Sequence, residues 1–274
     1  MNEEFSSRNP PPSNRQLLIL LAIFVGFITA IIYIIWLLVS NLVWLIPPQV
    51  EQQLAAVVTP AYEQLAQPSP AQDSLNQLLD RLETKLPVAN NTKRNYRVLY
   101  IPQNTVNALA LPGDLIVVYA GLISHVKSEN ELMMILGHEL GHFTNRDHLR
   151  GIGQALLLKF TLATIFGENG RLSGIIASAV ESVSSAQYSQ AQERKADDFG
   201  LMLLQATYEH VAGATDFFAR IDRQPGMDFA FLASHPSPRN RVDRLNRLIK
   251  EHRYQMGKTN PLPAALTNLD SLTR

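Results

Sequence analysis

The sequence predicts an α+β protein, mostly helical with a small antiparallel sheet, that follows one N-terminal transmembrane helix. Three observations carry this prediction. Residues 17–46 form an unbroken apolar run, short β-type runs cluster between residues 96 and 121, and helical spacing of apolar residues dominates the remainder. With 274 residues, the chain also has enough material for a large domain with its own hydrophobic core.

The apolar run at residues 17–46 is the strongest large-scale feature, and no charged residue occurs between Arg15 and Glu51. It exceeds the roughly 20 residues that a helix needs to span a bilayer. A buried core helix and a cleaved signal peptide are the alternatives. A signal peptide normally has an apolar region of about 7–15 residues before a small-residue cleavage site, whereas this run is longer and ends in bulky side chains. We therefore expect an uncleaved, single-pass membrane anchor after a polar tail, residues 1–16.

The flanking charges predict the orientation of this anchor. Arg8 and Arg15 precede it, and the first basic residue after it is Arg81. Positively charged flanks remain on the cytoplasmic side of a membrane. The N-terminus is therefore expected in the cytoplasm, and the remainder of the chain in the periplasm or another extracytoplasmic space.

Residues 50–94 are expected to form a helical connector that packs on the domain that follows. Helices are predicted at residues 50–66 and 74–86, and the second has leucines at helical spacing. The sequence "QPSPAQD" between them predicts a turn, with Asp73 or Ser74 as the cap of the second helix.

The main domain is expected at residues 95–254, before a polar C-terminal tail at residues 255–274. Its sheet is predicted from three β-type runs, "YRVLYI", "VNALAL" and "LIVVYAG", which turn residues separate. Helices are expected for most of the rest. Ser128 and Glu131 have the spacing of a capping box, so one helix should begin at about Glu129.

Composition excludes several functional classes. The formal net charge is zero, from 24 basic and 24 acidic residues, so no overall field favours nucleic acid, and no nucleic-acid partner is expected. Cysteine is absent, which excludes disulfides, thiolate metal ligands and a cysteine nucleophile.

The sequence "HELGH" within "ELMMILGHELGHF" points to a metal site. On a helix, His138 and His142 lie on one face about 5–6 Å apart, as two ligands of one metal require. Glu139 can reach a water molecule at the metal, where it would act as a general base. A third ligand is expected, and "QERKADDFG" supplies Glu193, with Asp197 one turn later to hold a ligand imidazole. The alternative is that this second stretch is only a solvated charged helix face.

Four stretches in this order resemble the gluzincin zinc metallopeptidase family that contains the HtpX heat-shock protease and the CAAX prenyl endopeptidases. They are "NALALPGDLIVVYAGLI", "ELMMILGHELGHFTNRDH", "QERKADDFG" and "SHPSPRNRVDRL". The resemblance implies a zincin fold, one zinc ion per chain, and three sets of residues. It assigns His138, His142 and Glu193 as zinc ligands and Glu139 as the catalytic base. Asp197 would hold a ligand imidazole in place. His235 and Arg241 would lie near the substrate and the oxyanion.

The resemblance also gives a role to "NALAL" as an edge strand on which an extended substrate pairs. The residues expected to bind the substrate are Asn107, Ala108, Leu109 and Ala110. An ordinary hairpin strand is the alternative. For "HPSPRNR", the alternative is an exposed basic helix face that begins at Pro238.

Three further expectations concern residues around this motif. Gly137 and Gly141, which flank the ligand face, should let a neighbouring element approach closely. The apolar segment 152–183 is expected to form core helices, with a membrane-facing lid as the alternative. The remaining histidines lack partners at ligand spacing and are expected at surface or structural positions: His125, His148, His210 and His252.

Together these features favour a membrane-anchored zinc endopeptidase of protein quality control, acting on protein or peptide substrates. A zincin-like binding or chaperone module that holds a substrate without cleaving it is the alternative, although such a module has no need of Glu139. A purely structural membrane protein would leave the His, Glu and Asp pattern unexplained. The oligomeric state is left open.

Overall fold

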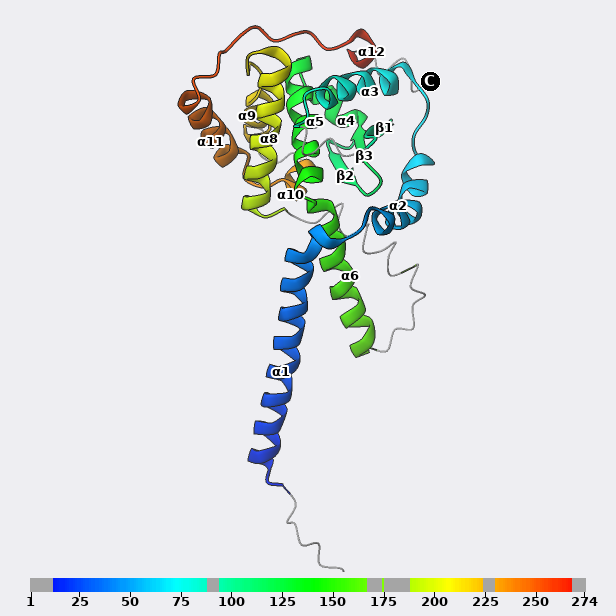
Figure 1. The fold of residues 1–274 in the computed structure, drawn as a ribbon, viewed down its shortest axis with the longest axis vertical. Coiled ribbons are helices and arrows are strands. Elements are labelled where there is room, and N and C mark those ends of the chain that lie inside the picture. The colour runs from blue at the N-terminus through cyan, green and yellow to red at the C-terminus, as the bar shows by residue number, and fades with distance from the viewer. Residues whose placement is uncertain (1–11, 88–93, 167–173, 175–187, 224–229, 268–274) are drawn as a thin grey trace, which may run out of the picture. The chain divides into compact units, whose positions relative to one another are not determined.

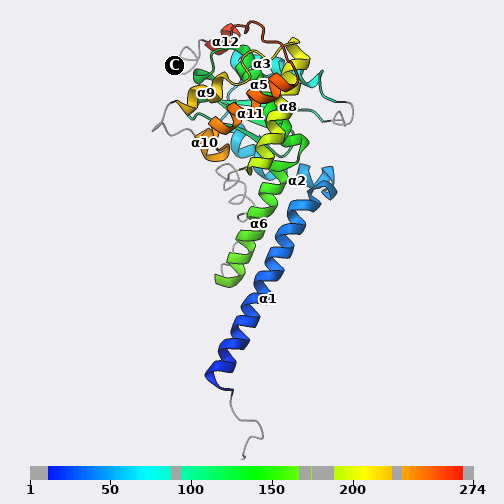
Figure 2. The ribbon, with the colours of Figure 1, turned by 90° about the vertical axis from the view of Figure 1, so that its left-hand side faces the viewer.

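The computed structural model describes residues 12–87, 94–166, 174, 188–223 and 230–267. The chain divides into two compact units, Met1–Leu42 and Val43–Arg274. Figures 1 and 2 show the elements from two sides. The first unit contains α1 (Asn14–Asn41). The second begins within the short 3-10 helix η1 (Leu42–Leu45) and contains α2 (Pro48–Glu63), α3 (Pro70–Glu83), β1 (Arg97–Ile101), β2 (Ala108–Leu111), β3 (Leu115–Tyr119), α4 (Ala120–His125), α5 (Glu129–Thr144), α6 (Asp147–Phe166), α8 (Gln190–Tyr208), α9 (Asp216–Asp222), α10 (Ala230–Ser234), α11 (Pro238–Glu251) and α12 (Ala264–Thr267).

The apolar run forms one long helix, as predicted. Ser13 caps α1 and exchanges hydrogen bonds with Gln16, so the helix begins just before the apolar residues. Among the described residues, Asn14–Leu45 is the one helical stretch long and apolar enough to cross a membrane, with a mean hydropathy of 3.0 in its most apolar window.

The three strands form a mixed sheet in the order β1-β3-β2, which corrects the prediction of an antiparallel sheet. β3 pairs in parallel with β1 and antiparallel with β2. β3 takes the central position, and its four residues from Leu115 to Val118 are all fully buried. After β1 the chain first forms the edge strand β2 and then returns as β3 between β1 and β2. β3 therefore runs antiparallel to β2 and parallel to β1.

Alternation along the strands divides the core into two clusters. One face of the sheet packs on α3 and α5, and its side chains come from Val98, Tyr100, Ala108, Ala110, Ile116 and Val118. The other face packs with Val58 of α2 and Ile152 of α6, and its side chains come from Leu99, Ile101, Leu109, Leu111, Leu115 and Val117.

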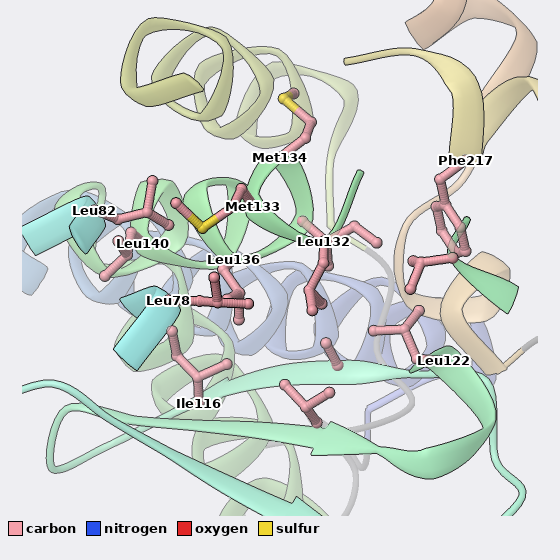
Figure 3. Close-up of a cluster of buried hydrophobic side chains, with 14 of the residues drawn as sticks. Leu78, Leu82, Ile116, Leu122, Leu132, Met133, Met134, Leu136, Leu140 and Phe217 are labelled. Carbon is pink, nitrogen blue, oxygen red and sulfur yellow. The ribbon is translucent and has the colours of Figure 1, made fainter. Parts of the chain in front are cut away.

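Helix α5 lies at the centre of the main unit, between α8 and the sheet (Figure 1). Every residue from Asn130 to Phe143 is buried. Figure 3 shows Leu136 of α5 directed towards Leu78 of α3 and Ile116 of β3, with Leu132 further along the helix. An apolar helix with neighbours on all sides explains why "ELMMIL" has no polar face.

The helix starts differ in detail from those predicted. α3 begins at Pro70 rather than near Ser74, because the side chain of Ser69 accepts the N–H of Gln72 and Pro70 takes the first helical position. α5 begins at Glu129, as predicted, and Ser128 accepts the N–H of Glu131. The Glu131 carboxylate does not complete the box, since it accepts the N–H of Lys127 and pairs with Arg220.

The predicted apolar segment 152–183 is described only in part. Its first portion belongs to α6, in which Ile152 is buried in the second core cluster and Leu158 is 59% exposed. Residues 167–173 and 175–187 lie outside the described residues.

Candidate active site

Helix α5 presents the two histidines of "HELGH" to one point. Because they lie one turn apart, Nε2 of His138 and Nε2 of His142 face each other at 3.1 Å. Glu139 follows on the same helix, fully buried, and neither of its carboxylate oxygens has a hydrogen-bond partner among the described residues. The arrangement places a carboxylate without a hydrogen-bond partner among the described residues beside two imidazole nitrogens that face each other.

Helix α8 brings the third predicted ligand to the same point. The Glu193 carboxylate lies 3.5 Å from Nε2 of His142 and 3.8 Å from Nε2 of His138. The close approach of α8 to α5 depends on glycine, as predicted. A Cβ on Gly141 would lie 2.7 Å from Cα of Ala196, and one on Gly137 would lie 3.0 Å from Cα of Gly200.

Asp197, one turn after Glu193, holds the imidazole of His138. Nδ1 of His138 donates to Oδ1 of Asp197 at 3.0 Å, which directs the unprotonated Nε2 towards the ligand cluster. Arg241 of α11 in turn pairs with both oxygens of Asp197, at 2.6 and 3.1 Å, and lies 3.0 Å from the Glu193 carboxylate. Arg241 is buried, unlike the exposed Arg239 and Arg247 of the same helix. It is therefore an internal ion partner rather than part of a basic surface.

His235, after α10, also enters the cluster. Its Nδ1 lies 2.9 Å from Glu193 and 3.2 Å from Nε2 of His138. Its Nε2 has no hydrogen-bond partner among the described residues and lies 3.7 Å from the Glu139 carboxylate. Ligand atoms of His138, His142, Glu193 and His235 all fall within 4.8 Å of one another.

The charges of the site favour a bound cation. Burial and the nearby Arg241 lower the pKa of His138 to about 4. Burial alone would also lower the pKa of His142, but its interactions with Asp147 and Glu193 outweigh this effect and raise it to about 10. Burial would raise the pKa of Glu193, yet the neighbouring His235 and Arg241 keep it well below its usual range. The site therefore combines an ionised Glu193 carboxylate with a neutral His138 imidazole, and its carboxylates favour positive charge at His142.

The donor set fits a metal ion such as zinc. Zinc–nitrogen bonds of about 2.0–2.1 Å in tetrahedral geometry place two ligand nitrogens about 3.3 Å apart, close to the 3.1 Å between the two imidazoles. Two neutral imidazoles and a carboxylate are also a common protein ligand set for zinc. The unpartnered Glu139 carboxylate beside them is then compatible with burial, because a water molecule at the metal can satisfy it.

Two residues near the site were not predicted. Asp147, at the start of α6, accepts a hydrogen bond from Nδ1 of His142 at 3.0 Å. The ring of Tyr188 stacks on His142 with centroids 3.9 Å apart. Burial and the nearby Glu139 raise the pKa of the Tyr188 phenol well above its usual value. Helical spacing marks neither residue in the sequence, because Asp147 lies beyond the corner that ends α5 and Tyr188 precedes α8.

The predicted substrate strand lies at the edge of the described sheet, next to α5. Asn107, Ala108, Leu109 and Ala110 are each at most 7% exposed. The N–H of Tyr119 bonds to the carbonyl of Asn107, and hydrogen-bonded pairs alternate in an antiparallel ladder. The backbone groups of Ala108 and Ala110 are therefore directed away from β3, and the Ala108 N–H bonds to its neighbour's side chain at 3.0 Å.

The remaining histidines lie outside the ligand cluster. His125 bonds to the carbonyl of Gly121, His210 accepts the N–H of Ala212, and His252 is exposed. His148 is fully buried and bonds to Glu51 at 3.0 Å, which is a structural role.

A cavity of about 300 Å³ between α8 and α11 adjoins the site. Its wall includes Glu193, Asp197 and Arg241, followed outward by Arg194 and Arg247. A route from solvent to the ligand carboxylate is thus available on this side, as metal entry requires.

The chain is similar to several known metalloproteases. Over 57% of this chain, the sequence is 29% identical to the metalloprotease LoiP of Escherichia coli. Over 63% of this chain, it is 25% identical to the beta-barrel assembly-enhancing protease of Yersinia pestis. It is 28% identical to the mitochondrial metalloendopeptidase OMA1 of Arabidopsis thaliana over 54%. The aligned parts cover 63%, 39% and 30% of these relatives, less than two thirds of each. The profile of Peptidase family M48 matches residues 70–249, from the start of α3 to the last turn of α11, and the chain belongs to this family of metallopeptidases.

Proposed function

We propose that the protein is a zinc-dependent endopeptidase, and the observation that carries this proposal is the buried Glu139 carboxylate beside three converging ligands. His138, His142 and Glu193 would hold the ion. When bound, zinc polarises the scissile carbonyl and lowers the pKa of water, which makes a nucleophile available at neutral pH.

The residues of the chain then divide the remaining work. Glu139 takes the proton from the attacking water and passes it to the leaving amine. Asp197 keeps His138 in the tautomer that presents Nε2, and Arg241 holds the carboxylates of Asp197 and Glu193 in place. His235 is assigned to the substrate oxygen, because its Nε2 has no other hydrogen-bond partner among the described residues.

The same proposal places the enzyme at a membrane. Residues 17–46 would anchor it, with the N-terminus in the cytoplasm and the peptidase domain on the other side, as the positive-inside rule favours. Membrane attachment would restrict the accessible substrates to misfolded or membrane-associated proteins, which is a role in protein quality control.

The decisive experiment tests whether cleavage requires a metal and whether the peptidase domain lies outside the cytoplasmic membrane. Intact spheroplasts of cells that express the protein should cleave added casein. Casein cannot cross the cytoplasmic membrane, so this cleavage requires a peptidase domain on the outer side. A chelator should abolish this cleavage, and zinc should restore it. The purified protein, extracted with detergent, should contain about one zinc ion per chain. Bound zinc without any cleavage would favour the binding module, and cleavage that survives the loss of all metal would contradict the proposal.

A substrate strand at the sheet edge leads to a further prediction. Ala110→Pro removes an N–H that is directed away from β3, so the sheet loses no internal hydrogen bond. If substrates pair with this edge, kcat/KM for peptides should fall by about tenfold, as expected for one lost hydrogen bond of roughly 1.5 kcal/mol. Steady-state kinetics and a thermal unfolding curve would measure both effects. An unchanged kcat/KM in a folded Ala110→Pro protein would exclude pairing at this position.

A further inference from the structure

The corner between α5 and α6 connects a ligand of the proposed metal site with the segment that follows the apolar helix in sequence. Three consecutive residues form the corner: Arg146, Asp147 and His148. Each side chain makes a different long-range contact, and the function considered so far uses none of them.

Asp147 is the contact to the metal site. It is fully buried, and its Oδ2 accepts from Nδ1 of His142 at 3.0 Å. Its Oδ1 accepts from Nε2 of Gln192 at 3.0 Å and from Arg150. All three partners are donors, so only a carboxylate, which has no donor of its own, satisfies them together. This contact holds the proton on Nδ1 of His142, so Nε2 is the nitrogen that would bind a metal ion.

Arg146 connects the corner to the start of the second unit. Its guanidinium donates to the carbonyls of Val43 and Ile46, at 2.9 and 2.8 Å, and lies over the ring of Trp44. The backbone of Arg146 is left-handed, with φ of +53°. Glycine adopts this conformation at the lowest cost after a helix. An arginine here indicates that the side-chain contacts compensate for the backbone strain.

His148 makes the third contact. Its Nε2 bonds to Glu51 of α2 at 3.0 Å, and Glu51 also pairs with Arg94. Burial would raise the pKa of Glu51, but His148 and Arg94 lower it to about 2, so the carboxylate is charged in the folded protein. Residues 43–51 are thus joined to the corner on both sides of Asp147.

We propose that Asp147 positions His142 for metal binding, and that residues 43–51 hold Asp147 in place through Arg146 and His148. This inference rests on the proposed metal function and adds a positioning residue to it. It also makes the segment between the apolar helix and α2 part of the support of the metal site, rather than a passive linker.

The test measures zinc affinity of the full-length protein in detergent, by competition with a chelating dye, together with thermal unfolding of the metal-free protein. Asp147→Asn keeps the shape of the side chain, but its NH2 group must face a hydrogen-bond donor, either His142 or the pair Gln192 and Arg150. Zinc affinity should fall by about 10- to 100-fold, as for other partners of ligand histidines. Adding Gln192→Glu supplies an acceptor for that NH2, so the double variant should recover most of the affinity. A purely structural role predicts no such recovery.

Arg146→Gly tests the second half of the inference. It relieves the left-handed backbone but removes the contacts to Val43 and Ile46, and zinc affinity should fall by about 2- to 30-fold. The matched control is Arg253→Gly, because Arg253 is also left-handed, with φ of +56°, follows α11 and is exposed. This control should bind zinc like the unaltered protein.

The outcomes separate the two proposals. If the unaltered protein binds no zinc, the proposed function itself fails. If it binds zinc and Asp147→Asn binds it equally tightly, only the positioning role of Asp147 is overturned. Equal affinity in Arg146→Gly and Arg253→Gly would overturn the role of residues 43–51. If Asp147→Asn does not fold, Arg146→Gly still tests whether residues 43–51 support the metal site, because it leaves every hydrogen-bond partner of Asp147 in place.

Discussion

Replacing Glu139 by glutamine should lower kcat for peptide hydrolysis by about 10²- to 10⁴-fold, the usual contribution of a general base. The substitution keeps the size of the side chain but removes its negative charge and its ability to accept a proton. Neither carboxylate oxygen of Glu139 has a hydrogen-bond partner among the described residues, so the substitution breaks no hydrogen bond that the structure describes. Casein or a quenched fluorescent peptide would measure the rate, and atomic absorption the metal content.

The metal content makes this prediction specific. Glu139→Gln should retain its metal, because the proposed ligands on α5 and α8 are untouched. Glu193→Gln is the matched comparison, with the same chemical change on a predicted ligand, and it should lose both metal and activity. A Glu139→Gln protein that holds metal and cleaves at the original rate would show that the proton is accepted elsewhere.

The sequence predicted those parts of the site that depend on short spacing. His138, Glu139 and His142 lie within two helical turns, so helix geometry alone brings the two imidazoles together. Glu193 and Asp197 could be placed on a second helix in the same way. Their approach to α5 is a long-range event, but Gly141 and Gly137 gave a local indication that another backbone comes near.

Other parts of the structure could not be predicted from local patterns. The order of the strands depends on which strand is buried on both faces, and the apolar content of the three runs is too similar to decide this. The role of Asp147 depends on the sharp corner at Arg146, whose left-handed backbone has no glycine to mark it. Arg241 has the same residue type as its exposed neighbours, and only the packing of α11 on α8 separates it from them.

A second large effect is expected at Gly141, where helix propensity and packing predict opposite results. In an exposed helix, Gly141→Ala would stabilise by about 1 kcal/mol. Here the new Cβ would lie 2.7 Å from Cα and 3.0 Å from the carbonyl oxygen of Ala196. These are backbone atoms, so no side-chain rotation can relieve the contact and the two helices must separate. We expect a net destabilisation of about 1–3 kcal/mol, and a larger one for Gly141→Leu.

The displacement should also reach the metal site, because Ala196 lies between Glu193 and Asp197 on α8. Zinc affinity and activity should therefore fall together with stability, as measured by zinc titration and thermal unfolding in detergent.

Two glycines provide graded controls for this effect. Gly26→Ala meets no atom within 4 Å, and a Cβ on Gly137 would lie 3.0 Å from Cα of Gly200, a less severe contact than that at Gly141. The loss of stability should therefore increase from Gly26→Ala through Gly137→Ala to Gly141→Ala. If Gly141→Ala is instead more stable and fully active, α5 and α8 can separate without cost. The close approach of the helices would then not be what holds Glu193 against the two histidines.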